Sequence, residues 1–129
     1  MIRFRCNKIS RDKTLQRMAD AQVITHYRHL QGPELAQALR AKLLEETHEV
    51  LTSTDRTELV AELADVLEVI TAICDQQGIS QAELLGVQAE TKALRGGFSQ
   101  GVFMEYIEMA DDSPWVAHFR KQPDKYPEF

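Results

Sequence analysis

The stretch that decides the fold is Lys42–Asp65, KLLEETHEVLTSTDRTELVAELAD. A turn of small polar residues at 52–55 divides this stretch into the end of one segment and the start of the next. Asp55 is followed three residues later by Glu58, which is the pattern of a helix N-terminal cap. We therefore expect two successive helices joined by a short turn.

Similar signals predict the remaining helices. Gly32-Pro33 marks a helix start, Gly78 marks a helix end, and Ser80 with Glu83 forms a second capping pattern. The expected helices span about 11–19, 32–51, 55–78 and 80–94. Residues 23–27 are β-branched and aromatic and favour an extended conformation, and a tail with three prolines predicts little regular structure. The predicted fold class is therefore all-α.

Two pairs of carboxylates interrupt the apolar faces of the two central helices. At about 100° per residue, Glu46 falls within the apolar stripe of its helix, and Glu62 falls inside the apolar arc of residues 59–74. Glu49 and Asp65 lie at the borders of these faces, one turn from their partners. Four converging carboxylates would repel one another and lose hydration, and a hard divalent cation such as Mg²⁺ would compensate for this cost. The alternative is that both pairs lie on solvated helix faces, as most glutamates do.

Composition indicates an ordinary globular protein. The chain has 129 residues, 43% of them hydrophobic and 27% charged, which fits one domain. No apolar run approaches the roughly 20 residues needed to span a bilayer, and the N-terminus lacks the apolar region of a secretory signal. Only Cys6 and Cys74 are present, so free thiols in a reducing, cytoplasmic compartment are expected. The net charge of −5 argues against a general nucleic-acid binder, and no membrane partner is expected.

Basic residues are concentrated at the N-terminus. Residues 1–17 carry six basic groups and one acidic group, although the whole chain is acidic. Such a segment could cover a phosphate-bearing ligand, or it could pair with the protein's own acidic helices. Both interpretations remain open from the sequence.

The apolar surface of the predicted helices exceeds what three helices can cover in one chain. The arc of residues 59–74 is broad, and large exposed apolar patches are uncommon on monomers. A homodimer that completes a helical bundle would cover this arc, and a homotetramer is also compatible with it.

Three motifs in order resemble a known family. They are Glu-x-x-Glu at 46–49, with Glu-x-x-Asp at 62–65 after twelve residues; NK at 7–8 followed by RDK at 11–13; and KALRGGF at 92–98. Together they resemble the MazG-like all-α nucleoside triphosphate pyrophosphohydrolases, in particular the phosphoribosyl-ATP pyrophosphohydrolase-like subgroup. The resemblance covers about residues 7–102. Ile9-Ser10 replace the usual Leu-Val, a change that should not alter the chemistry.

The resemblance implies a fold of antiparallel helices, completed by dimerisation, in a domain of residues 1–105 followed by a tail of residues 106–129. It also implies hydrolysis of a nucleotide to a monophosphate and pyrophosphate. Mg²⁺, or Mn²⁺, would be held by the four catalytic carboxylates, namely Glu46, Glu49, Glu62 and Asp65. Glu46 is the candidate for activating water, because its core-side position should increase its basicity. The candidate phosphate contacts are Lys13, Lys92 and Arg95, with Lys8 and Arg11 behind them.

Two other functions remain open. One is the phosphoribosyl-ATP pyrophosphohydrolase reaction of histidine biosynthesis, although the extra N-terminal motif and the long tail fit it less well. The other is a non-enzymatic helical dimer whose acidic sites bind metal only for structure. The sequence does not predict the base or the sugar of the substrate, because a few unplaced side chains decide both.

Overall fold

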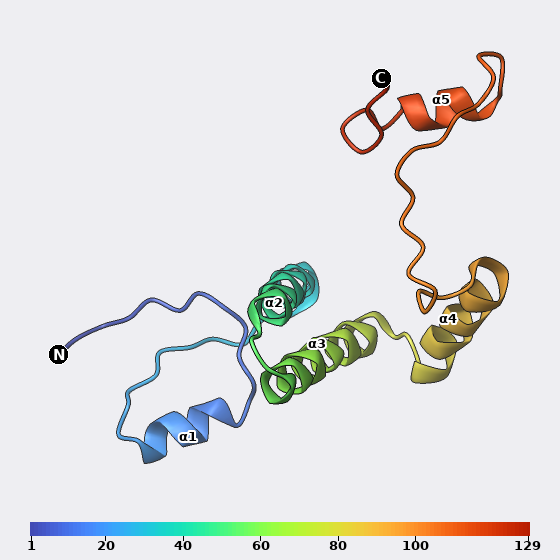
Figure 1. The fold of residues 1–129 in the computed structure, drawn as a ribbon. Coiled ribbons are helices and arrows are strands. Elements are labelled where there is room, and N and C mark those ends of the chain that lie inside the picture. Colours follow the sequence, from blue (N-terminus) through green and yellow to red (C-terminus); the bar gives the residue numbers. More distant parts are fainter. The chain divides into compact units, whose positions relative to one another are not determined.

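The computed structural model describes residues 1–129 and contains five helices and no strand, so the predicted all-α fold class is confirmed (Figure 1). The helices are α1 (Thr14–Asp20), α2 (Gly32–Thr52), α3 (Arg56–Gln77), α4 (Gln81–Arg95) and α5 (Trp115–Arg120). No helix combines the length and the apolar character needed to cross a membrane. Residues 23–27, expected to favour an extended conformation, form no strand.

The chain divides into two compact units, Met1–Thr91 and Lys92–Phe129. The first unit holds α1, α2, α3 and most of α4. In the second, α5 is the one helix after α4, and Arg120 donates two hydrogen bonds to the carboxylate of Glu128, at 2.9 and 2.7 Å. Edge-to-face contacts join Phe119 to Tyr126 and Tyr106 to Phe129. The proposed boundary near residue 105 stays a prediction.

Helices α2 and α3 form an antiparallel hairpin. Only residues 53–55 separate them, and the Gln76 side chain near the end of α3 donates to the Gly32 carbonyl at the start of α2, at 3.3 Å. Both limits of α3 form as the capping signals predict. The Asp55 carboxylate accepts from the Glu58 amide at 2.8 Å, and Gly78 ends the helix with a left-handed φ of 69°.

Local signals also mark the start of α2 and both ends of α4. Pro33 lies in the first turn of α2, where its missing amide hydrogen costs nothing, and the Ser80 hydroxyl accepts from the Glu83 amide at the start of α4. Gly96 has a φ of +80° directly after α4, a conformation that favours glycine, so it ends this helix. The predicted helix limits are therefore confirmed to within a few residues.

The core of the hairpin is small. Leu39, Val69 and Cys74 are its buried apolar residues, and Glu46 is buried among them. Much of the broad apolar arc of α3 is open within the single chain, because Leu63 is 49% exposed and Leu67 is 63% exposed. Both cysteines are free thiols, as predicted.

Candidate active site

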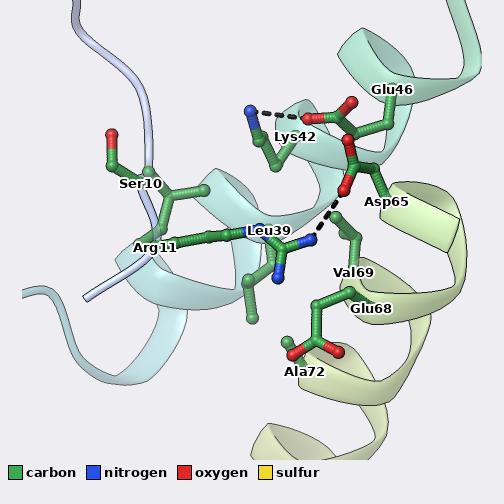
Figure 2. Close-up of a pocket in the computed structure, with 10 residues that line it drawn as sticks. Ser10, Arg11, Leu39, Lys42, Glu46, Asp65, Glu68, Val69 and Ala72 are labelled. Carbon is green, nitrogen blue, oxygen red and sulfur yellow. Dashed lines mark hydrogen bonds and ion pairs between the residues drawn. The ribbon is translucent and has the colours of Figure 1, made fainter. Parts of the chain in front are cut away.

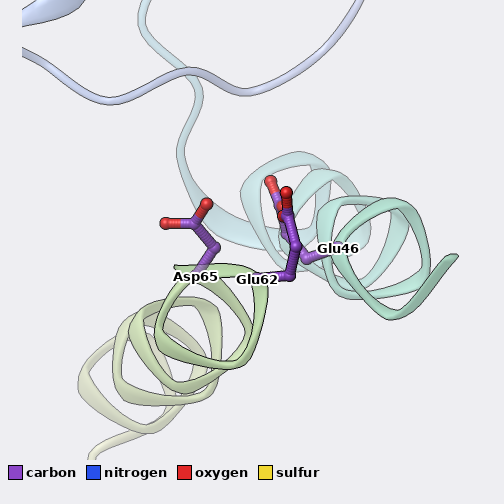
Figure 3. Close-up of side chains that lie close together, drawn as sticks. All are labelled: Glu46, Glu62 and Asp65. Carbon is purple, nitrogen blue, oxygen red and sulfur yellow. The ribbon is translucent and has the colours of Figure 1, made fainter. Parts of the chain in front are cut away.

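Three carboxylates from the α2–α3 hairpin converge. One oxygen each from Glu46, Glu62 and Asp65 lies within 4.8 Å of the others (Figure 3). Glu46 comes from α2 and is buried, whereas Glu62 and Asp65 come from α3, one turn apart, and are half-buried. The antiparallel hairpin brings the second half of α2 next to the first half of α3. The side chain of Glu46 therefore meets those of Glu62 and Asp65, which follow it by 16 and 19 residues in the sequence.

Glu49 lies outside this group of three. Glu49 is exposed and lies one turn after Glu46 on α2. Its charge nevertheless acts on the group, since it is one of the charges that raise the pKa of Glu62. The structure therefore brings together three of the four predicted metal ligands and leaves Glu49 outside the group.

The electrostatic environment of Glu62 is unfavourable for its charged form. Loss of hydration raises the pKa of the Glu62 carboxyl above its ordinary value, and the negative charges of Glu49 and Asp65 raise it further. A site with this repulsion favours either a proton or a cation. Hence the cluster has the electrostatics expected of a cation site.

Lys42 supplies a positive charge next to Glu46. Its Nζ lies 2.7 Å from Glu46 Oε1 and 3.3 Å from Glu45 Oε2, and its side chain is only 19% exposed. Burial acts to lower the pKa of Lys42, but the hydrogen bonds to Glu46 and Glu45 outweigh this effect, so the pKa lies above its ordinary value. No functional role was predicted for Lys42, although its position one turn before Glu46 was an available signal.

The N-terminal segment, residues 8–11, contacts both helices of the hairpin. Lys8 Nζ donates to Glu45 Oε1 on α2 at 2.9 Å, and Arg11 Nη2 donates to Asp65 Oδ1 on α3 at 2.7 Å. The hydrogen bond from Lys8, together with that from Lys42, lowers the pKa of the Glu45 carboxyl. The interpretation in which the basic segment pairs with the protein's own acidic helices is thus realised for these two residues.

A cavity of about 160 Å³ opens between this segment and the hairpin (Figure 2). Its polar lining includes Arg11, Lys42, Glu46 and Asp65, and its apolar floor includes Leu39 and Val69. The close-up shows the Arg11 side chain reaching across the cavity to Asp65, while Lys42 points to Glu46. Positive and negative groups therefore line the same cavity.

The other predicted phosphate contacts are not among the residues that line this cavity. Lys13 is the exposed residue that precedes α1, and it makes no ion pair. Lys92 and Arg95 lie in the last turns of α4 and belong to the second unit. Their role in binding phosphate stays a prediction.

A model of the phosphoribosyl-ATP pyrophosphohydrolase family matches residues 13–89, which is more than half of the chain. The chain belongs to this family. The match includes the three clustered carboxylates, Glu49 and Lys42, and it begins after Lys8 and Arg11. No curated protein and no solved structure gives a significant match.

Membership of the phosphoribosyl-ATP pyrophosphohydrolase family confirms the resemblance inferred from the motifs. The chain is accordingly an enzyme, a hydrolase that acts on a phosphoanhydride of a nucleotide. This finding excludes the interpretation of the chain as a non-enzymatic helical dimer.

The clustered side chains fit a hard divalent cation. All three donors are carboxylate oxygens, and the cluster contains no cysteine or histidine, which softer metals would favour. Oxygens bound to Mg²⁺ at about 2.0–2.1 Å lie at most about 4.2 Å apart. Small rotations of the half-buried Glu62 and Asp65 side chains would bring the three oxygens to this spacing.

Proposed function

We propose that this enzyme uses Mg²⁺, or Mn²⁺, to hydrolyse a nucleoside triphosphate or a related nucleotide to the monophosphate and pyrophosphate, and that it serves to clear unwanted nucleotides from the pool. The observation that carries this proposal is the convergence of Glu46, Glu62 and Asp65 beside a cavity that also contains Arg11 and Lys42. Anionic groups that can hold a metal and cationic groups that can hold phosphate are what a phosphoanhydride hydrolase needs.

The carboxylates have distinct proposed roles. Glu46, Glu62 and Asp65 would hold the metal, and Glu49 would join them by turning inward from its exposed position. The metal would polarise the phosphoryl oxygens and neutralise charge that develops on them. We assign the activation of water to Glu46, since it is the most buried of the carboxylates and Lys42 fixes one of its oxygens.

Basic residues would position the phosphates. Arg11 lines the cavity, and a guanidinium can bind two phosphate oxygens at once. Lys8 lies three residues away on the same segment and would add a second positive charge. Lys13, Lys92 and Arg95 complete the proposed set of phosphate contacts.

Phosphoribosyl-ATP is the second candidate substrate. The name of the matching family favours it, and its cleavage to phosphoribosyl-AMP and pyrophosphate would use the same cluster. The N-terminal motif and the residues after 105 favour the first candidate, since the family match begins only at Lys13, the last residue of that motif, and ends at residue 89.

A homodimer is the proposed assembly, with a homotetramer as the larger alternative. Leu59, Leu63 and Leu67 follow one another at intervals of four residues on α3, and all three are exposed. A second copy that covers this face would complete a helical bundle and remove apolar surface from water. The two free thiols agree with the proposed cytoplasmic location.

The test is a panel of ordinary nucleotides, damaged nucleotides and phosphoribosyl-ATP, incubated with the full-length protein and Mg²⁺. We expect pyrophosphate and a monophosphate from at least one nucleoside triphosphate, and no activity in excess chelator. Orthophosphate as the first product would overturn the proposal. Turnover of phosphoribosyl-ATP alone would favour the second candidate.

A further inference from the structure

The two basic residues of the N-terminal segment have partners of different kinds. Arg11 pairs with Asp65, one of the three clustered carboxylates, whereas Lys8 pairs with Glu45, which lies outside the cluster. Both contacts are partly exposed ion pairs of similar length, 2.7 Å for Arg11 and 2.9 Å for Lys8. Of these two residues, only Arg11 therefore holds a carboxylate that the metal would need.

We propose that Arg11 couples metal binding to nucleotide binding: it neutralises Asp65 until a divalent cation takes that carboxylate, and the released guanidinium then binds the phosphates of the substrate. This inference rests on the proposed function and adds an exchange of partners to it. Without substrate, Arg11 and the metal compete for Asp65. Once phosphate is present, both bind the phosphate, so each favours the binding of the other.

The position of Arg11 suits this exchange. Its side chain is 59% exposed, so little packing would oppose its movement. It lines the same cavity as Glu46, Lys42 and Asp65, so a phosphate next to the metal would lie within its reach. A guanidinium forms forked hydrogen bonds with carboxylates and with phosphates alike, and its charge does not depend on pH in the ordinary range.

Lys42 does not fit the same role. Its ammonium lies between Glu45 and Glu46 and is mostly buried, so it would have to break two contacts in order to leave. Lys8 does not fit it either, because its carboxylate partner is not among the clustered ligands. Arg11 is thus the cation that competes with a metal for Asp65 and is free enough to exchange that carboxylate for a phosphate.

The experiment compares metal affinity and pyrophosphate affinity in matched variants of the full-length protein. Calorimetry measures the binding of Mn²⁺ as it is titrated into the metal-free wild type, into Arg11→Ala and into Lys8→Ala. Arg11→Ala removes the competitor, so its Mn²⁺ dissociation constant should fall about two- to fivefold, the size expected for one partly exposed ion pair. Lys8→Ala removes the same charge from the same segment and should leave this constant within about twofold of wild type.

The second measurement uses magnesium pyrophosphate as the probe. Arg11→Ala should bind it about tenfold or more weakly than wild type, since a charged hydrogen bond to phosphate is lost. Arg11→Lys keeps the positive charge and should recover part of this affinity. Arg28→Ala removes an exposed basic group whose partner is Glu34, away from the cavity lining, and should leave both constants unchanged.

Opposite effects of Arg11→Ala on the two ligands would support the exchange, because a purely structural ion pair would not tighten metal binding. If Arg11→Ala binds Mn²⁺ no better than Lys8→Ala, or binds magnesium pyrophosphate as well as wild type, the inference is wrong and the proposed function still stands. If wild type binds no Mn²⁺, the proposed function itself fails. Circular dichroism of each variant confirms that the helices remain formed.

Discussion

Replacement of Lys42 by methionine tests how much Lys42 stabilises the fold when no metal is bound, by neutralising the buried carboxylate of Glu46. Methionine keeps the apolar stem of the lysine and removes only its charge. Glu46, whose side chain is 11% exposed, then loses the ammonium that lies 2.7 Å away. Exposed ion pairs contribute up to about 1 kcal/mol, whereas loss of one partner from a buried pair costs about 3–5 kcal/mol. This pair is intermediate in exposure, so we expect a loss of about 1–3 kcal/mol in the free energy of unfolding.

Metal should reduce this loss. A divalent cation held by Glu46, Glu62 and Asp65 would itself neutralise Glu46, so the variant and the wild type should differ by less than about 1 kcal/mol in saturating Mg²⁺. The assay is urea unfolding followed by circular dichroism, in chelator and in Mg²⁺, at one fixed protomer concentration because an oligomer would make stability depend on concentration.

Two controls isolate the pair. Arg28→Met breaks an ion pair with Glu34 in which both side chains are more than half exposed, so it should change stability by less than about 0.5 kcal/mol. The double variant Lys42→Met/Glu46→Gln should be less destabilised than the sum of the two single variants, because the buried charge is then absent. A loss below about 0.5 kcal/mol in chelator, or an equal loss with and without Mg²⁺, would refute this account of Lys42.

Three further predictions concern other parts of the chain. Glu62→Gln should abolish most turnover yet leave the metal-free fold as stable as wild type or slightly more so, because neighbouring carboxylates repel the charge of Glu62. In thermal unfolding, Mg²⁺ should stabilise the wild type alone. An active variant would show that Glu62 is not a metal ligand. Leu67→Lys should convert the proposed dimer to a monomer near 14.7 kDa in light scattering, and wild type that already has this mass would contradict the proposed assembly. The contact between Arg120 and Glu128 should weaken in acid: Arg120 lowers the pKa of Glu128, so the contribution of the pair is present above the ordinary value of 4.5 and is lost as the pH falls through the lower folded value. In an NMR titration Arg120→Gln should return the pKa of Glu128 to the ordinary value; an unchanged pKa would show that Arg120 is not the cause.

The helix limits could be predicted because local chemistry determines them. Asp55, Gly78 and Ser80 each act on backbone groups within a few residues, and all three do so in the structure. The spacing of Glu46 and Glu62 on their helices is likewise a local property, so it predicted that both would lie toward the hairpin interface.

The ion pairs of the N-terminal segment could not be predicted in the same way. Arg11 and Asp65 are 54 residues apart, and Lys8 and Glu45 are 37 apart, so no local pattern specifies which cation meets which carboxylate. The exposure of Leu63 and Leu67 was also not predictable residue by residue. Their periodicity indicates a covered face, but it does not state whether the same chain or a second copy provides the cover.

The balance of charge around the cluster explains how this site can form before a metal arrives. Carboxylates alone would repel one another, but Lys42 neutralises Glu46 and Arg11 neutralises Asp65, so Glu62 is the member of the cluster that keeps no cationic partner. The raised pKa belongs to this same residue. Residual repulsion is therefore concentrated at the half-buried Glu62, in a hairpin whose α3 is capped by Asp55 and packed against α2. It follows that removal of metal should abolish activity and leave the helical fold in place, in contrast to small domains that fold only around their metal.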